Sequence, residues 1–420
     1  VLYNKPLSHR RTDDGKTVCK RYRHGKGRAC SARRASLGVC RGGAHKGSPL
    51  PGRGDRGCIY RKGPLAGAGF YNSRSLIRVR ILSRNTNDKM DEAFFRRRVR
   101  YALAYRQQVM GEDSAACRLI FGEADGFPGW TVDRYGDVLV SEVLSLGIEQ
   151  RRAMLYALLR EELSSLGVNV SCIYERNESL IREKEGMTCG KGAYAAPGLE
   201  TNPSGHAEIC ENGIYFDVDY INGQKTGYFL DQKYNRAAAG RLAHGRRVLD
   251  CFTHTGAFAL HCAACGAESV TAVDVSASAL EQARRNAVRN GLEGRVEFRQ
   301  AEVFALLTEL GKSGAKPWDY IILDPPSFTT SGATLENARS GYREINRRAM
   351  QILPRGGYLA TCSCSHFMTD ELFRAMLADA ARDASVQLRQ IEARQQSPDH
   401  PILWGVPETD YLKFYLFQVV

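Results

Sequence analysis

The distribution of apolar and polar residues divides the chain into a first part without regular periodicity and a longer part that has it. Residues 76–81 alternate as in a strand, and residues 91–110 show the spacing of an amphipathic helix. The polar face of this helix is rich in arginine and is either a solvated face or a stripe that faces RNA. Its arginines are Arg96, Arg97, Arg98, Arg100 and Arg106. Short strands are predicted between residues 118 and 146, followed by a helix over 148–166 and a strand over 171–175. These elements predict a small α+β domain.

A Gly- and Pro-containing linker is predicted over residues 187–206, and a hairpin over 207–219 with its turn at Glu211-Asn212-Gly213. From Arg247 onward, predicted strands and helices alternate. The predicted strands cover residues 248–250, 269–273, 295–300, 319–323, 357–363, 387–394 and 411–419. The predicted helices cover residues 257–265, 276–290, 303–310, 337–353 and 369–384. This alternation predicts an α/β fold with a doubly wound, mostly parallel sheet.

The first strand–helix–strand unit of this region carries the first chemical signal. Asp250 ends one strand, a turn with Thr255 and Gly256 follows, and Asp274 ends the next strand. Ligands of open α/β sheets bind at these strand ends, and an acid after the second strand can accept hydrogen bonds from a ribose diol. The turn lacks the G-x-G-x-x-G pattern, which disfavours a dinucleotide and favours S-adenosylmethionine. The alternative is that the acids only cap helices.

Two further groups end strands at the same predicted edge. Asp324 precedes two prolines, which stop the strand and turn the chain over the ligand edge, and its alternative role is to initiate a turn. Cys362 and Cys364 share one face of the following strand, with Cys364 nearer the edge. A thiolate there can attack a nucleobase, although small buried thiols are also common. The pair Cys262 and Cys265 has no second ligand pair, which favours core packing over metal binding.

The net charge of +13 is concentrated at the N-terminal end. Residues 1–62 contain 17 Lys and Arg against three acids, so the other 358 residues contain 42 bases and 43 acids. Two interpretations of residues 1–62 stay open: a disordered basic arm that binds RNA, or a segment translated out of frame. The odd count of 13 cysteines predicts reduced thiols, and no apolar run reaches the length of about 18 residues needed to cross a membrane. We therefore expect a cytoplasmic protein.

Many separate motifs carry a family resemblance from about Leu65 to the end of the chain. They are GFYNSRSLIRVRIL, DEAFFRRR, GEADGFPGWTVDRYGD, IYER, GQKTGYFLDQ, LDCFTHTGAFALH, VDVS, DPPSF, GYREIN, TCSCSH and DHPILWGVPETDYLK. With these motifs in this order, the chain resembles the bacterial large-subunit ribosomal RNA methyltransferase I family. That family uses S-adenosylmethionine to make 5-methylcytosine in 23S rRNA.

The resemblance implies a class I methyltransferase domain, a Rossmann-like doubly wound sheet, over residues 191–420 and a central α+β domain over 91–190. Residues 63–90 would be the remnant of an RNA-binding PUA-like domain, and residues 1–62 a basic, disordered or mis-framed segment in place of most of it. Carried over by motif, the residues that hold the cofactor would be Phe229, Asp231, Asp250, Thr255, Gly256, Asp274, Glu302 and Asp324. Glu302 stands where the family usually has Asp, and Asp324 would lie between cofactor and base. No metal is expected.

The resemblance also implies a reaction. Cys364 would attack C6 of cytosine, with Asp324 at N3, and the adduct would then accept a methyl group at C5. The expected partner is 23S rRNA, with no membrane involved, and the oligomeric state stays open, a homodimer being one alternative. Rival interpretations are a purine N-methyltransferase that needs Asp324 but no thiol, and a non-catalytic RNA-binding protein with the same fold.

Overall fold

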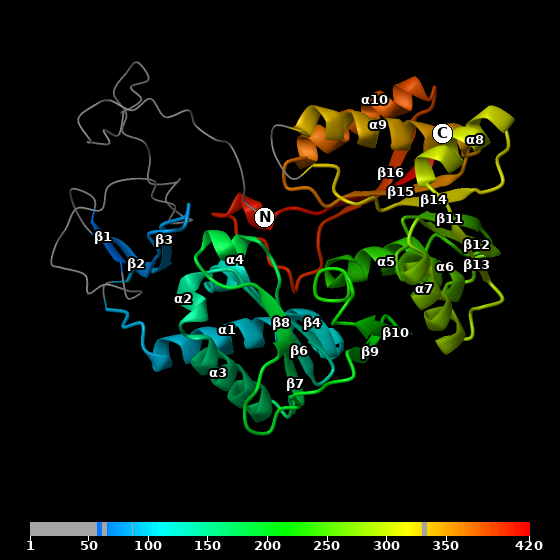
Figure 1. Cartoon of the computed structure of the whole chain (residues 1–420). Helices are drawn as coiled ribbons and strands as arrows, with labels where there is room; N and C mark the ends of the chain where they lie inside the picture. The colour runs from blue at the N-terminus through cyan, green and yellow to red at the C-terminus, as the bar shows by residue number, and fades with distance from the viewer. Residues whose placement is uncertain (1–56, 61–64, 86, 330–333) are drawn as a thin grey trace, which may run out of the picture.

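The computed structural model describes residues 57–60, 65–85, 87–329 and 334–420 (Figure 1). Its first element is a three-stranded antiparallel sheet of β1 (Gly57–Tyr60), β2 (Leu65–Tyr71) and β3 (Val79–Ser83). The alternation predicted over 76–81 is therefore a strand that begins and ends slightly later. Nearly all of the basic segment 1–62, and with it both interpretations of that segment, lies outside the described residues.

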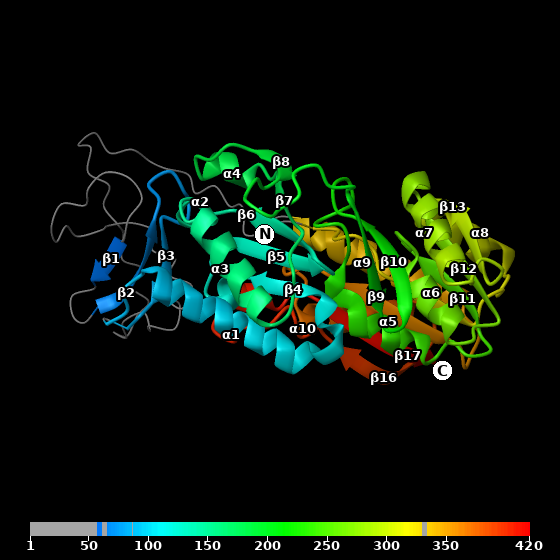
Figure 2. The same ribbon diagram turned by 90° about the horizontal axis from the view of Figure 1, so that it is seen from below.

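A long helix and a five-stranded sheet follow. The helix α1 (Glu92–Met110) begins where the Asp91 carboxylate accepts the N–H of Phe94 at 3.0 Å. The sheet has the order β4-β5-β6-β7-β8, mostly antiparallel, and α1 lies beside α3 (Arg152–Ser165) against it (Figures 1 and 2). Its strands are β4 (Ala116–Phe121), β5 (Trp130–Tyr135), β6 (Val138–Val143), β7 (Cys172–Asn177) and β8 (Gly190–Ala193). The short helices α2 (Leu146–Glu149) and α4 (Ile181–Lys184) connect them.

The linker predicted over residues 187–206 is wrong at one point, because β8 lies within it and pairs with β7. This strand contains Gly190 and Gly192 and has no apolar alternation to reveal it. Backbone pairing alone defines it. The predicted hairpin is confirmed as β9 (His206–Glu211) and β10 (Ile214–Asp219), with positive φ at Asn212 and Gly213 in its turn.

The second half forms a seven-stranded sheet of order β13-β12-β11-β14-β15-β17-β16. It is parallel except for β17, which pairs antiparallel with both of its neighbours, so the predicted mostly parallel α/β sheet is confirmed. Its strands are β11 (Arg247–Cys251), β12 (Ser269–Asp274), β13 (Val296–Gln300), β14 (Tyr320–Leu323), β15 (Tyr358–Ser363), β16 (Leu388–Arg394) and β17 (Lys413–Val419).

Helices cover both faces of this sheet (Figure 1). They are α5 (Lys233–Gly240), α6 (Ala257–Ala264) and α7 (Ala277–Arg289) on one face, and α8 (Val303–Ser313), α9 (Leu335–Ile352) and α10 (Asp370–Asp383) on the other. Adjacent strand residues belong to different cores: Val248 lies in the core that includes Phe258 of α6, whereas Leu249 lies in the core that includes Met350 of α9. The central strands are therefore apolar on both sides, as a doubly covered sheet requires.

Strand order reverses between β11 and β14, because the chain first builds outward to β13 and then returns to the other side of β11. The carboxyl ends of β11, β12, β14 and β15 meet at this switch point. Asp250, Asp274 and Asp324 follow or end three of these strands, and Cys364 follows the fourth. The fold thus brings the predicted groups to the edge where open α/β sheets bind ligands.

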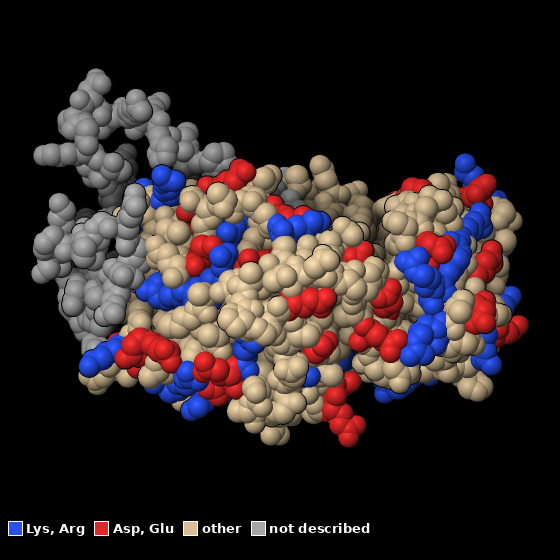
Figure 3. All heavy atoms as spheres, turned by 60° about the horizontal axis from the view of Figure 1, so that its bottom comes forward, with Lys and Arg blue, Asp and Glu red and all other residues tan. Residues whose placement is uncertain are grey.

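The arginines predicted on the polar face of α1 are largely occupied within the protein. Arg106 is buried and pairs with Asp125, and Arg98 donates to the backbone carbonyl oxygens of Leu82 and Gly126. Arg96 contacts three glutamates. Basic and acidic side chains are also interspersed on the face shown in Figure 3. A continuous RNA-facing arginine stripe on α1 is therefore not what the structure shows. No described helix is long and apolar enough to cross a membrane.

Candidate active site

The turn after β11 has an unusual backbone. Phe252 and His254 have φ values of 64° and 51°, and Gly256 follows at 83°. Residues other than glycine rarely adopt such angles, and here hydrogen bonds hold the turn: the N–H of His254 donates to Asp274 Oδ2 at 2.9 Å. A Cβ on Gly256 would lie 3.0 Å from Cβ of Ala283 in α7. Strained turns of this kind cluster at ligand sites, and this one lies between two strand ends.

Asp250 is buried below this turn. Its Oδ2 accepts the hydroxyl of Thr253 at 2.5 Å and the N–H of Ala259 at 3.0 Å. Its Oδ1 has no hydrogen-bond partner among the described residues, nor has the buried hydroxyl of Thr255. Burial, with the nearby Asp324 carboxylate, raises the pKa of Asp250 to about 7. Buried polar atoms without partners fit a ligand that brings hydrogen-bond donors and positive charge, as S-adenosylmethionine does.

Two predicted cofactor residues already have backbone partners. Asp274 accepts the N–H of His254 and the N–H of Ser276, the latter at 2.9 Å, so its carboxylate is fixed at the end of β12. Glu302 lies at the start of α8, and its carboxylate accepts the N–H groups of Phe304 and Ala305 at 3.0 and 2.7 Å. Each carboxylate keeps lone pairs for a ligand, but Glu302 also has a clear structural role as a helix cap.

The segment between β10 and α5 lies against the turn. Phe229 makes an edge-on contact with His254, with ring centroids 5.3 Å apart. Lys225 has a positive φ of 53°, and its ammonium group lies 4.3 Å from the centre of the Phe229 ring and 3.3 Å from Asp231 Oδ2. The predicted residues Phe229 and Asp231 are therefore beside the turn, together with a lysine that the sequence interpretation did not single out.

Asp231 is buried and keeps its charge. Burial alone would raise its pKa, but Lys225, His400, the hydroxyl of Tyr411 at 2.7 Å and Arg118 lower it well below its usual value. Its Oδ1 has no partner among the described residues. A permanent carboxylate with one unpaired oxygen can hold a donor group of a ligand.

Asp324 and the two cysteines come together at the ends of β14 and β15. Burial and the Asp231 charge raise the pKa of Asp324 to about 6. Gln232 opposes this rise in the pKa of Asp324, and the Asp324 charge in turn helps to raise the pKa of Cys362, which is completely buried. Cys364 is half-buried, and burial raises the pKa of its thiol to about 11. As predicted, both cysteines lie near Asp324, and Cys364 is the more accessible one.

Two cations oppose that rise. Lys225 and Lys413 both lower the pKa of Cys364, and burial lowers the pKa of Lys413 itself to about 8. Lys413 is buried and donates to the carbonyl oxygens of Ser365 and Tyr411 at 2.6 and 2.8 Å. Lys413 and Tyr411 lie in or next to a strand that the sequence predicts, but the alternation of apolar residues does not indicate which site these two side chains approach. Their position follows from the antiparallel pairing of β17 with β15.

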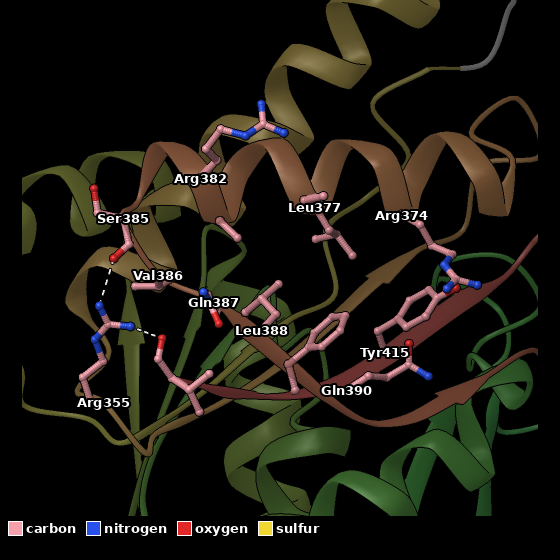
Figure 4. A pocket seen from close by; sticks show the side chains of 14 residues that line it. Arg355, Arg374, Leu377, Arg382, Ser385, Val386, Gln387, Leu388, Gln390 and Tyr415 are labelled. Carbon is pink, nitrogen blue, oxygen red and sulfur yellow. Dashed lines mark hydrogen bonds between the residues drawn. The ribbon is translucent and has the colours of Figure 1, made fainter.

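The described residues hold no group of three or more His, Cys, Asp or Glu close enough to bind a metal ion. A cavity of about 870 Å³ lies elsewhere, between α10 and the strands β16 and β17 (Figure 4). Arginines, neutral polar side chains and apolar side chains line it, with no side-chain carboxylate or thiol, and its Arg355 donates to the backbone oxygens of Ser385 and Val420. It lacks the groups for the chemistry at the strand ends, so we place the candidate active site at the switch point.

Comparison with known proteins shows the family to which the chain belongs. Residues 189–418 match the family model described as S-adenosylmethionine-dependent methyltransferase. A protein named ribosomal RNA large subunit methyltransferase I from Shewanella denitrificans is 41% identical over 86% of this chain and 89% of its own length. The proteins of that name from Shewanella amazonensis and Klebsiella pneumoniae are 40% and 38% identical over 94% and 86% of this chain, and over 98% and 88% of their own length. The chain belongs to the ribosomal RNA large subunit methyltransferase I family.

As a member of the ribosomal RNA large subunit methyltransferase I family, the chain is an S-adenosylmethionine-dependent methyltransferase, and the predicted cofactor is confirmed. A solved SAM-dependent methyltransferase structure from Streptococcus mutans has a TM-score of 0.71 and 22% identity, covering 84% of this chain and 88% of that one. A methyltransferase structure in complex with SAH has the same values. At this identity the likeness supports the fold alone, and the predicted class I methyltransferase fold is confirmed.

Proposed function

We propose that the protein methylates carbon 5 of a cytosine in 23S rRNA through a covalent adduct with Cys364. The relatives named above act, by their names, on large-subunit ribosomal RNA, which supports the substrate class. The observation that carries the cytosine assignment is the pairing of Cys364 with Asp324 at adjacent strand ends. Methylation of a purine nitrogen needs no thiol, whereas C5 of cytosine needs activation by a nucleophile at C6.

The proposed cofactor site is the turn and its surroundings. Its residues are Phe229, Asp231, Asp250, Thr255, Gly256, Asp274, Glu302 and Asp324. When bound, S-adenosylmethionine supplies an electrophilic methyl group. The unpaired oxygen of Asp250 and the hydroxyl of Thr255 would bind its polar groups, Asp274 would accept the ribose hydroxyls, and Glu302 would contact the adenine. Phe229 and Asp231 border the site from the adjoining segment.

The first chemical step is attack by Cys364. Its thiol is protonated at neutral pH, since burial raises its pKa to about 11, so the proton must leave as the sulfur attacks. Asp324 is the proposed acceptor, because it lies at the adjacent strand end and a carboxyl group with a pKa of about 6 is largely ionised at neutral pH. The sulfur forms a bond to C6, and the C5–C6 π electrons become available at C5 for the methyl group.

Asp324 then completes the proton transfers. Having accepted the thiol proton, it donates a hydrogen bond or the proton to N3 of the base, which stabilises the adduct. After methylation, a base removes the C5 proton, and the electrons of that bond restore the C5–C6 double bond and expel the sulfur as a thiolate. The proton held by Asp324 or N3 returns to the sulfur, which leaves 5-methylcytosine and the free thiol. The permanent charge of Asp231 beside Asp324 favours the protonated form of Asp324 that this step needs. A paired base cannot reach such a site, so the cytosine must be unpaired or flipped out of its stack.

We also propose the domain division stated above: the methyltransferase domain over residues 191–420, the central α+β domain over 91–190, and PUA-like residues over 63–90. The sheets of residues 116–193 and 247–419 support the two larger units. They contact each other where Lys233 of α5 donates to the carbonyl oxygen of Ala116 at 2.9 Å.

The test is methyl transfer from labelled S-adenosylmethionine to unmodified 23S rRNA, followed by nucleoside analysis. We expect label in 5-methylcytosine for the wild type and a loss of at least about 1,000-fold for Cys364→Ala. Cys189→Ala is the matched control, because this thiol is exposed and distant in sequence from the strand ends. Label in a purine, or full transfer by Cys364→Ala, would contradict the cytosine proposal and favour a purine N-methyltransferase. If the wild-type protein binds S-adenosylmethionine but transfers no methyl group, a non-catalytic RNA-binding role is favoured.

A further inference from the structure

Trp404 is the most exposed large apolar side chain of the described residues. Its exposed fraction is 97%, whereas Trp130 is completely buried in the core of the five-stranded sheet. The adjacent Leu403 is also exposed, at 42%. A single exposed apolar residue is ordinary, but a tryptophan held almost entirely in solvent is not, since its ring loses the most by exposure.

The loop that carries Trp404 is rigidly built. The hydroxyl of Thr409 accepts the N–H of Leu403 at 2.8 Å and donates to the carbonyl oxygen of Val406 at 2.7 Å. The N–H of Val406 donates to the carbonyl oxygen of Leu403 at 2.7 Å. The amide of Gln396 donates to the carbonyl oxygens of His400 and Thr409 from below. These bonds hold the loop ends together, so Trp404 is presented by a fixed turn.

Both ends of this loop are attached to the candidate active site. At one end the N–H of Ser397 donates to the carbonyl oxygen of Asp231 at 2.8 Å. At the other end Tyr411 donates to the carboxylate of the same residue, and Lys413 contacts the chain next to Cys364 through Ser365. The loop, red in Figure 1, runs from the seven-stranded sheet toward the five-stranded one, where His400 lies against Phe121 with ring centroids 5.4 Å apart. The loop that carries Trp404 is thus fixed at both ends to residues of the candidate site, while Trp404 itself lies in solvent.

We propose that Trp404 stacks on an RNA base next to the target nucleotide. The inference rests on the proposed function, because a cytosine that leaves its stack also leaves an unstacked neighbour. Aromatic rings bind such bases face to face whatever the base. Contact through phosphate is disfavoured, since residues 395–412 contain no Lys or Arg and three acids, Asp399, Glu408 and Asp410. The exposed ring, rather than charge, is what this loop offers to RNA.

The test compares substitutions of Trp404 in the full chain. We expect Trp404→Ala to raise the KM for unmodified 23S rRNA by about 5- to 150-fold, the range measured for loss of one base–aromatic stack. Trp404→Phe should retain most of the affinity, and Trp404→Leu should behave like the alanine variant because it lacks a ring. The Kd for S-adenosylmethionine and the melting temperature should not change in any of them. Tyr215→Ala is the matched control, since this aromatic is 40% exposed on the β9–β10 hairpin.

Three outcomes would overturn the inference. An unchanged KM for Trp404→Ala would show that the ring does not contact RNA. Full activity of Trp404→Leu would show an apolar contact without stacking. An unchanged KM together with loss of binding to another protein would assign the residue to a protein partner.

If the wild type transfers no methyl group to 23S rRNA, the proposed function fails first. Stacking is then tested by tryptophan fluorescence. The emission of Trp404 is the difference between the wild type and Trp404→Phe, and stacking requires that rRNA quench it; emission that rRNA leaves unchanged would overturn the inference.

Discussion

Asp250 shows at the scale of one residue how the site is maintained at a cost to the fold. Its carboxyl group is buried and accepts two hydrogen bonds, but its Oδ1 has no partner among the described residues. The folded protein therefore binds a proton at Asp250 more tightly than the unfolded chain does, because its pKa rises from 3.8 to about 7. By linkage, this residue lowers stability as the pH rises from about 4 to 7.

We predict that Asp250→Asn stabilises the cofactor-free protein at pH 8, by about 1–3 kcal/mol, and changes its stability little at pH 4. The same substitution should abolish most of the additional stability that S-adenosylmethionine confers on the wild type, because the carboxylate that attracts the cofactor is gone. Thermal unfolding with and without cofactor at the two pH values measures both effects. A variant that is less stable than the wild type at pH 8 would contradict this account of Asp250.

The sequence predicts the position of some residues of the candidate site and not of others. Asp250, Asp274 and Asp324 end or follow apolar strands, and a strand end is visible in the sequence. Lys225, Tyr411 and Lys413 follow no such rule. Their position depends on how a loop and an antiparallel strand return to the switch point, and no local pattern encodes this return. Their roles became visible only through contacts.

At the scale of secondary-structure elements, most boundaries follow from period and caps. Alternation with helices predicted the seven strands of the large sheet, whereas β8 was missed because its glycines carry no pattern. Neither interpretation of the α1 arginines, a solvated face or an RNA-facing stripe, holds for every one of them, because a polar face in the sequence is a solvent face only if no acid or carbonyl oxygen contacts it. Arg98 and Arg106 meet both kinds of partner.

The start of α8 tests whether Glu302 has one role or two. We predict that Glu302→Ala lowers the free energy of unfolding by about 1 kcal/mol, because two N–H groups lose their acceptor. Glu302→Ser should keep the stability, since serine caps helices well, but should weaken S-adenosylmethionine binding by about 5- to 10-fold if the carboxylate contacts the cofactor. Calorimetric titration and denaturant unfolding separate the two roles. Unchanged cofactor affinity in Glu302→Ser would leave Glu302 a cap only.

At the scale of the whole molecule, the two large sheets are joined through buried polar groups. Arg118 on β4 pairs with Asp133 at 2.7 Å, and Asp133 in turn accepts the hydroxyl of Thr226. The backbone N–H of Arg118 donates to the Asp399 carboxylate at 2.8 Å. The positive charge of the Arg118 side chain lowers the pKa of Asp231. One arginine of the five-stranded sheet thus supports the candidate site on the seven-stranded sheet.

We predict that Arg118→Met lowers the free energy of unfolding by about 3–5 kcal/mol, because it leaves the buried Asp133 carboxylate without its charged partner. Arg100→Ala is the control, since its pair with Glu162 is largely exposed on the arginine side and should contribute less than about 1 kcal/mol. Denaturant unfolding measures both. Equal, small effects of the two substitutions would show that the two sheets do not depend on this pair.

The central claim is the bond between Cys364 and C6 of cytosine, and trapping that bond tests it most directly. In 23S rRNA transcribed with 5-fluorocytidine, loss of a proton from C5 is impossible, so the methylated adduct should accumulate. We expect a cofactor-dependent protein–RNA complex stable to denaturation, and peptide mass spectrometry should place the modified nucleotide on Cys364. No complex should form with Cys364→Ala, whereas Cys189→Ala should form it fully. A complex attached at Cys362, or undiminished complex in Cys364→Ala, would contradict the account.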